Sequence, residues 1–220
     1  MKQTIDWHEF WTRDRQGFHE GRVNRYLQRH FSDFGLETGD AVFVPLCGKA
    51  VDLHWLAQQG HPVIGVELSA VAIESFFADS ELPYERSEEG AFTVYRSINI
   101  TLYQGDYMRL EPRHLESCRL VYDRASLVAI ESFNRPSYAR HMQAIVPDAT
   151  PMLLVTLEYD QRKMDGPPFS VPLDEVKSLY APGYQVQQLE AVEQIDERPK
   201  WREIGLESLV ERALRLEPKP

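Results

Sequence analysis

The residue types that could do chemistry in this chain stand where short apolar runs end. The turn PLCGK, at 45–49, follows the run AVFV and contains Gly48, where a ligand could approach the backbone closely. Glu67 ends the next apolar run, about twenty residues later, where a carboxylate can accept hydrogen bonds from both hydroxyl groups of a ribose. A plain turn and a helix-entry charge would explain each feature separately. Together they favour an adenosine-type cofactor.

The glycine pattern limits which cofactor this turn could hold. Gly48 stands alone, whereas the dinucleotide-binding motif needs G-x-G-x-x-G. Lys49 is followed by Ala50, and no glycine precedes the pair at the spacing of a phosphate-binding loop. Tight pyrophosphate binding is therefore disfavoured. A nicotinamide oxidoreductase is a weaker alternative, because Glu67 would suit it and the glycines would not.

Two further polar clusters follow later apolar runs. Asp106 could meet the amino group of an adenine and Tyr107 could cover its face, although a loop aspartate and a packing aromatic explain both residues as well. Asp123 and Arg124 end another run. An arginine at a strand end can bind an anionic or carbonyl-bearing acceptor. The alternative is a structural ion pair between the two residues.

Other catalytic arrangements are not indicated. The seven histidines are scattered without H-x-x-x-H spacing, C-x-x-C is absent, and no G-x-S-x-G motif occurs, so neither a metal site nor a serine hydrolase of that class is expected. Cys47 is interpreted as a small buried residue of the turn rather than a nucleophile. Trp7, Trp11 and Phe18 precede an amphipathic helix, where they could be core residues or a lid over a ligand.

The elements that must position these residues alternate between strand and helix. Strands are expected at 41–46, 62–66, 93–96, 98–104, 119–123, 151–158, 184–190 and 208–216. Helices are expected at 23–34, 50–59, 70–79 and 136–146. This order predicts an α/β fold built on a parallel sheet, with a hairpin inserted at 93–104. The stretch 160–172 is a long loop, which could be a lid, a substrate wall or a plain surface excursion.

Composition sets outer limits on the function. The chain has 220 residues, a hydrophobic fraction of 43% and a net charge of −10, which suits one globular domain and disfavours binding to nucleic acid. No apolar run reaches the roughly 18 residues of a membrane span, and the N-terminus lacks the apolar region of a signal peptide. With only two cysteines, a reducing, cytoplasmic location is expected.

Four blocks carry a resemblance to a known family. They are FVPLCGKAVDLHWLAQQGHPVIGVELS at 43–69, the pair Trp7 and Trp11, YDRASLVAI at 122–130 and GPPFSVP at 166–172. Taken in their order along the chain, and over nearly its whole length, they resemble the thiopurine S-methyltransferase family and its compact, bacterial-type members. The resemblance implies a class I S-adenosylmethionine-dependent methyltransferase fold. This fold is Rossmann-like, with a seven-stranded, mostly parallel sheet, flanking helices and an antiparallel last strand.

The resemblance also implies a domain plan and residue roles. Residues 1–220 form a single methyltransferase domain, with an N-terminal lid segment at 1–34 and an α/β core at 35–220. The positions that match cofactor contacts are Trp11, Leu46, Glu67, Asp106, Tyr107 and Arg124. Phe18 and Arg124 match the substrate side, and Arg124 is the candidate catalytic residue. Ser126 stands where the family has glycine or alanine.

The activity implied is S-methylation of thiopurines or related aromatic thiols, with S-adenosyl-L-methionine as cofactor and no metal. A sulfonium methyl group is already activated and a thiopurine thiol ionises near neutral pH, so the protein must mainly align the acceptor. Arg124 is expected to orient that acceptor, and segment 7–18 to exclude water. The alternatives are methylation of selenite- or tellurite-type oxyanions and a cofactor-binding module without turnover. We expect a monomer whose partner is a small thiol or chalcogen molecule.

Overall fold

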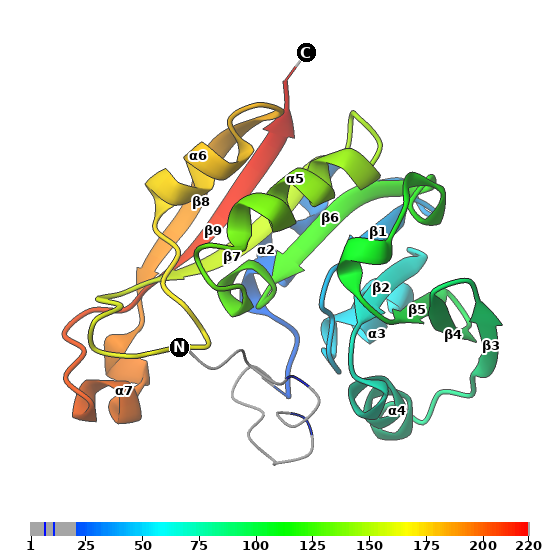
Figure 1. Ribbon diagram of the computed structural model, residues 1–220, viewed down its shortest axis with the longest axis horizontal. Coiled ribbons are helices and arrows are strands. Elements are labelled where there is room, and N and C mark those ends of the chain that lie inside the picture. The colour runs from blue at the N-terminus through cyan, green and yellow to red at the C-terminus, as the bar shows by residue number, and fades with distance from the viewer. Residues whose placement is uncertain (1–6, 8–10, 12–20, 220) are drawn as a thin grey trace. The chain divides into compact units, whose positions relative to one another are not determined.

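A computed structural model describes Trp7, Trp11 and residues 21–219 (Figure 1). The prediction for Phe18 lies outside the described residues. The chain divides into two compact units, Met1–Cys118 and Arg119–Pro220, which are taken in turn. The single-domain plan therefore stays a prediction.

The first unit is built on a sheet whose strand order is β3-β4-β5-β2-β1. Its strands are β1 (Ala41–Val44), β2 (Val63–Glu67), β3 (Glu85–Glu89), β4 (Phe92–Ser97) and β5 (Ile100–Gln104). Strand β2 pairs in parallel with β1 and with β5, whereas β4 is antiparallel to β5 and forms the predicted hairpin. Every residue of β1 and β2 is buried, as expected for parallel strands covered on both faces.

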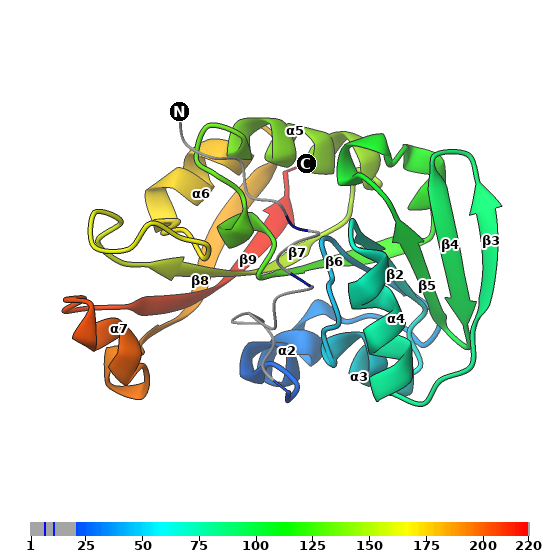
Figure 2. The same cartoon turned by 60° about the horizontal axis from the view of Figure 1, so that its bottom comes forward.

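Short helices precede β1 and follow β1, β2 and β5 in this unit. They are α2 (Arg25–His30), η1 (Phe31–Phe34), α3 (Asp52–Gln58), α4 (Ala70–Asp79), η2 (Tyr107–Arg109) and η3 (Pro112–His114). Helices α3 and α4 contact β2 (Figure 2). The side chain of Ser69 caps α4 by accepting a hydrogen bond from the amide of Ala72, and Ile73, Phe76 and Phe77 are buried along that helix.

Strand β3 is the element that the sequence pattern missed. Its residues ERSEE are all exposed, so they show no apolar alternation. The strand is held by antiparallel pairing with β4 and by an ion pair between Arg96 and Glu89. The described residues thus contain nine strands, five in the first unit and four in the second, rather than the seven that the family resemblance implies.

The second unit carries strands in the order β6-β7-β9-β8 (Figure 1). They are β6 (Cys118–Arg124), which begins at the boundary, β7 (Met152–Glu158), β8 (Tyr184–Glu193) and β9 (Val210–Pro218). Strands β6 and β7 are parallel. The last strand, β9, is antiparallel to both β7 and β8, which confirms the predicted direction. It lies between them in the sheet, and its Ala213, Leu214 and Leu216 are fully buried.

The helices of this unit are α5 (Arg135–Ile145), α6 (Leu173–Tyr180) and α7 (Pro199–Glu203), with the single turns η4 (Leu127–Ala129) and η5 (Ile195–Glu197). Helices α5 and α6 lie side by side over the strands (Figures 1 and 2). The connection from β7 to α6 has neither helix nor strand, which confirms the predicted loop at 160–172. In the described part of the chain, no helix is long and apolar enough to span a membrane.

Candidate functional site

In the first unit, Glu67 and the PLCGK turn form one hydrogen-bonded cluster. The amide of Gly48 donates to Oε2 of Glu67 at 2.9 Å, and the amide of Ser69 donates to Oε1 at 2.9 Å. Glu67 is only 6% exposed. A carboxylate offers about four acceptor positions, and these two amides occupy one on each oxygen. The turn after β1 is thereby tied to the carboxyl end of β2, as the spacing predicted.

The backbone of this turn is strained. Leu46 has φ 43° and Gly48 has φ 52°, both in the left-handed region that residues with side chains disfavour. A Cβ atom on Gly48 would also lie 2.8 Å from Cζ2 of Trp11. Trp11 therefore lies against the turn. Residue 48 is suited to glycine for two reasons: its φ is positive, and Trp11 occupies the space that a Cβ atom would need.

The two remaining polar side chains of the turn are explained by packing and pairing. Burial, and to a lesser extent the charge of Glu67, raises the pKa of the Cys47 thiol well above its usual value. Since the thiolate is the reactive form, the raised pKa disfavours a nucleophilic role and favours the interpretation of Cys47 as a buried packing residue. Lys49 Nζ lies 3.0 Å from Asp79 Oδ2, so this lysine is paired with the end of α4.

The Asp106 turn adjoins Glu67 through the backbone. The amide of Gly105 donates to the carbonyl oxygen of Glu67 at 2.9 Å. Asp106 is exposed, and its Oδ1 accepts from the amide of Met108 at 2.9 Å, which caps η2. Tyr107 is only 5% exposed, as a packing aromatic would be. The ends of β1, β2 and β5 therefore meet in one place, with Asp106 at its rim.

In the second unit, Asp123 organises the turn that bears Arg124. Its Oδ2 accepts from the Tyr138 hydroxyl at 2.8 Å, and its Oδ1 accepts from the amide of Leu127 at 3.1 Å. Burial raises the pKa of Asp123 to about 6, against the opposing effect of these hydrogen bonds and of those from Ser126. Ser126 is fully buried, so its hydroxyl serves Asp123. Arg124 itself is partly exposed.

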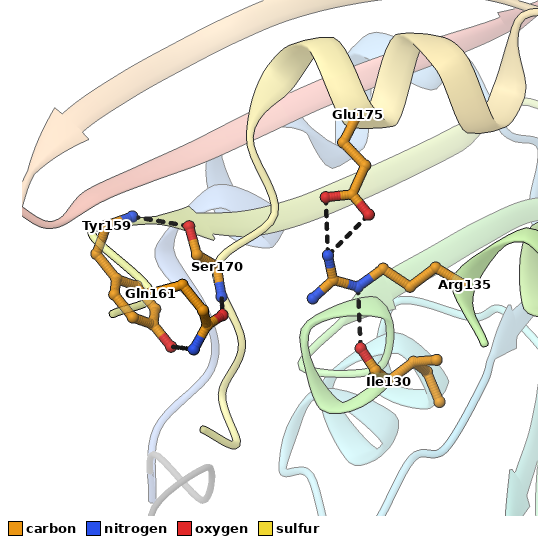
Figure 3. A network of polar contacts seen from close by, with 6 residues as sticks. All are labelled: Ile130, Arg135, Tyr159, Gln161, Ser170 and Glu175. Atoms are coloured by element: carbon orange, nitrogen blue, oxygen red, sulfur yellow. Dashed lines mark hydrogen bonds and ion pairs between the residues drawn. The ribbon is translucent and has the colours of Figure 1, made fainter. Parts of the chain in front are cut away.

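Sequence reasoning missed a buried arginine beside this turn. Arg135 is 1% exposed, and its Nη1 donates to both carboxylate oxygens of Glu175 at 2.8 Å (Figure 3). Its Nε donates to the carbonyl oxygen of Ile130 at 2.9 Å. An arginine in the first turn of a helix looks like a surface charge in sequence, and its partner lies 40 positions away. No local signal could have found the pair.

A hollow in the first unit lies apart from these clusters, and the described residues form no candidate metal site. A hollow of about 300 Å³ in the first unit is lined by the beginnings of β2 and β5, including Pro62 and Asn99, and so lies at the opposite strand ends from Glu67. Among the residues that the structure describes, no three His, Cys, Asp or Glu side chains gather as a metal site would require.

Comparison with known proteins identifies close relatives. A sequence profile described as thiopurine S-methyltransferase matches residues 2–219. A thiopurine S-methyltransferase of Marinobacter nauticus is 48% identical, over 83% of this chain and 84% of its own. One from Pseudomonas entomophila is 45% identical, over 96% of this chain and 97% of its own.

Similarity to solved structures extends to distant proteins. Phosphoethanolamine N-methyltransferase 2 of Haemonchus contortus, in complex with S-adenosyl-L-methionine, superposes with a TM-score of 0.70 at 12% identity, covering 100% of this chain and 61% of that one. An S-adenosylmethionine-dependent methyltransferase from Anabaena variabilis gives a TM-score of 0.63 at 13% identity, covering 100% and 98%. At these identities the likeness shows a shared fold, the methyltransferase α/β fold.

Proposed function

The chain belongs to the thiopurine S-methyltransferase family, and we propose that it transfers the methyl group of S-adenosyl-L-methionine to the sulfur of a thiopurine or a related aromatic thiol. One observation carries the proposal for this chain: a buried carboxylate, Glu67, fixed by backbone amides at the end of β2 and tied to the turn after β1. In an open α/β sheet this is where a nucleoside ligand is held.

On the cofactor side, Glu67 would accept hydrogen bonds from the ribose hydroxyl groups, because its amide partners hold both oxygens at fixed positions. Gly48 lets the ligand approach the backbone, and the ring of Trp11 beside it would cover the ligand and attract the sulfonium charge. Leu46 would contribute an apolar contact from the strained turn. When bound, the cofactor supplies an activated methyl group.

On the acceptor side, the reaction is an in-line displacement. An ionised acceptor sulfur would take up the methyl group that the cofactor supplies, and the residues of this chain would hold the two reactants in line. The thiol proton has already gone to solvent, so no strong general base is needed. The role of Arg124 would be to orient the anionic acceptor. Asp123 and Ser126 hold the turn in which Arg124 ends β6.

The remaining expectations concern partners and location. The net charge of −10 favours a small-molecule partner over nucleic acid. Cys47 and Cys118 are both buried and form no disulfide with each other, which suits a reducing cytoplasm. The chain is also proposed to be a monomer.

The test is transfer of a labelled methyl group from S-adenosyl-L-methionine to 6-mercaptopurine and to thiophenol, with selenite as the comparison acceptor. The proposal expects methyl thioether products from the thiols and slower transfer to selenite. Turnover of selenite alone would replace the thiol by the oxyanion as substrate. Binding of the cofactor without transfer to any acceptor would leave a cofactor-binding module.

A further inference from the structure

The segment 159–172, which connects β7 to α6, is long for a connection in a compact unit, yet it is densely hydrogen bonded. Gln161 is the centre of this bonding (Figure 3). Its Nε2 donates to the carbonyl oxygen of Met164 at 2.5 Å and to the Tyr159 hydroxyl at 3.1 Å. Its Oε1 accepts from the amide of Ser170 at 2.7 Å. One side chain thus braces both arms of the segment.

Tyr159 adds two further bonds between the arms. Its amide donates to Oγ of Ser170 at 3.0 Å, and its hydroxyl donates to the carbonyl oxygen of Pro168 at 2.5 Å. Burial raises the pKa of Tyr159 to about 12, so the hydroxyl keeps its proton and remains a donor at neutral pH. The brace is therefore made of neutral groups and does not depend on pH near neutrality.

The braced segment is fastened to the turn that follows Arg124. The amide of Phe169 donates to the carbonyl oxygen of Val128, in η4, at 2.6 Å. A Cβ atom on Gly166 would overlap the ring of Phe169, so that ring rests against the segment's own backbone. The position of the segment therefore sets the position of an aromatic side chain beside the Arg124 turn.

Arg135 forms a second connection between this turn and the part of the chain around the segment. Its guanidinium joins Ile130, at the end of η4, to Glu175, in the first turn of α6 directly after the segment. A buried arginine is tolerated only when its charge is paired and its donors are satisfied. The turn 125–130 is thus linked to the segment 159–172 at Phe169, and through Arg135 to α6, the helix into which that segment leads.

We infer that Gln161 and Arg135 are positioning residues that hold the segment 159–172 as a fixed wall against the Arg124 turn and thereby set which acceptor fits. The inference rests on the proposed function, since it names the side on which the acceptor is selected. If the segment stays at a fixed distance from the Arg124 turn, it suits a flat aromatic thiol. A mobile segment would not hold the acceptor sulfur in line with the methyl group.

The test uses Gln161→Glu, which keeps the size of the side chain, removes both N–H donors and sets a carboxylate against the Met164 carbonyl. The matched control is Gln143→Glu. Gln143 Nε2 also donates to two carbonyl oxygens, of Ala139 at 3.1 Å and Leu179 at 3.4 Å, but it joins α5 to the end of α6. Both variants lose two donors of the same kind in the same unit.

For Gln161→Glu we expect the KM for 6-mercaptopurine to rise about tenfold, the loss that one or two hydrogen bonds imply. We expect S-adenosylhomocysteine affinity to stay within about twofold, and selectivity between 6-mercaptopurine and thiophenol to fall. Gln143→Glu should change none of these. Equal effects of the two variants on KM, or parallel losses of KM, cofactor affinity and melting temperature in Gln161→Glu, would overturn the inference.

Failure of the proposed function is distinguishable from failure of this inference. If the unmodified protein binds S-adenosylhomocysteine but methylates neither thiol, the function fails. The wall is then judged by amide hydrogen exchange in full-length protein. The inference expects faster exchange across residues 159–172 in Gln161→Glu than in Gln143→Glu, and equal exchange would overturn it.

Discussion

At the scale of single residues, the buried carboxylates of Glu67 and Asp123 lie in different environments. Glu67 is held by two backbone amides, from Gly48 and Ser69, which suits a hydrogen-bond acceptor kept in a fixed position. Asp123 is completely buried, and its pKa is raised to about 6. Glu67 is suited to accept hydrogen bonds from a ligand. Asp123 stabilises a turn, and burial makes its ionisation costly.

Asp123 should make folding stability depend on pH. Its pKa rises from 3.8 to about 6 on folding, so the folded state binds the proton more tightly, and the stabilisation is full below pH 4 and lost as pH rises through 6. The loss amounts to on the order of 3 kcal/mol. In Asp123→Asn this dependence should disappear. Urea unfolding at pH 4.5, 6 and 8 measures it, with the exposed Asp174→Asn as control. A constant difference between Asp123→Asn and the unmodified protein across pH would contradict the assignment.

Arg124→Ala should lower methyl transfer far more than stability. Arg124 is partly exposed at the end of β6, so we expect its removal to cost little stability, whereas the acceptor would lose its orienting cation. We expect kcat/KM for 6-mercaptopurine to fall by roughly 100-fold, as for a charge-assisted hydrogen bond, with a melting temperature within a few degrees of the unmodified protein. Arg119→Ala, on the same strand and exposed, is the control. Equal kcat/KM in the two variants would remove Arg124 from the mechanism.

At the scale of elements, several contacts fix the conformation of the turn after β1. It combines positive φ at Leu46 and Gly48, an amide bond to Glu67 and the ring of Trp11 against the glycine. Backbone strain of this kind persists only where surrounding contacts hold it in place. The conformation of the turn therefore depends on Gly48, which has no Cβ atom.

A comparison of Gly48→Ala with Gly90→Ala separates the cost of a positive φ from the cost of a steric clash with Trp11. Gly90, in the β3–β4 turn, has φ 64° and no neighbouring atom within 4 Å of the position a Cβ would take, whereas Gly48 has φ 52° and Trp11 at 2.8 Å. Both alanine variants should lose about 1 kcal/mol from conformation. Only Gly48→Ala should also lose cofactor affinity, by roughly tenfold or more, because Trp11 must move. Calorimetry with S-adenosylhomocysteine and thermal melting measure both effects. Equal affinity in the two variants would show that Trp11 does not constrain this turn.

The elements also show what a sequence can predict. Strands β1 and β2 and the Ser69 cap were predictable, because buried apolar runs and capping residues are local signals. Strand β3 was not, since an all-polar edge strand is fixed by pairing with its neighbour. The meeting of Gly48 with Glu67 followed from topology, whereas the Arg135–Glu175 pair depends on how α5 and α6 pack and leaves no trace in either segment.

For the whole molecule, the family match over residues 2–219 accounts for the order of its elements, and the two compact units divide the candidate roles. The first holds Gly48 and Glu67, proposed for the cofactor, and the second holds Arg124 and the 159–172 segment, proposed for the acceptor. Substitutions of Gly48 and Glu67 should therefore act on cofactor affinity, and those of Gln161 on acceptor kinetics.

The most direct measurement is calorimetric titration of the full chain and of Glu67→Gln with S-adenosylhomocysteine, with NADH as the parallel ligand. Glutamine keeps the size of the side chain but turns one acceptor oxygen into a donor that faces a backbone amide. We expect binding of S-adenosylhomocysteine and not NADH, weakened by about 1–3 kcal/mol in Glu67→Gln. Unaltered affinity in Glu67→Gln, or binding of NADH alone, would contradict the assignment of Glu67 to the cofactor ribose.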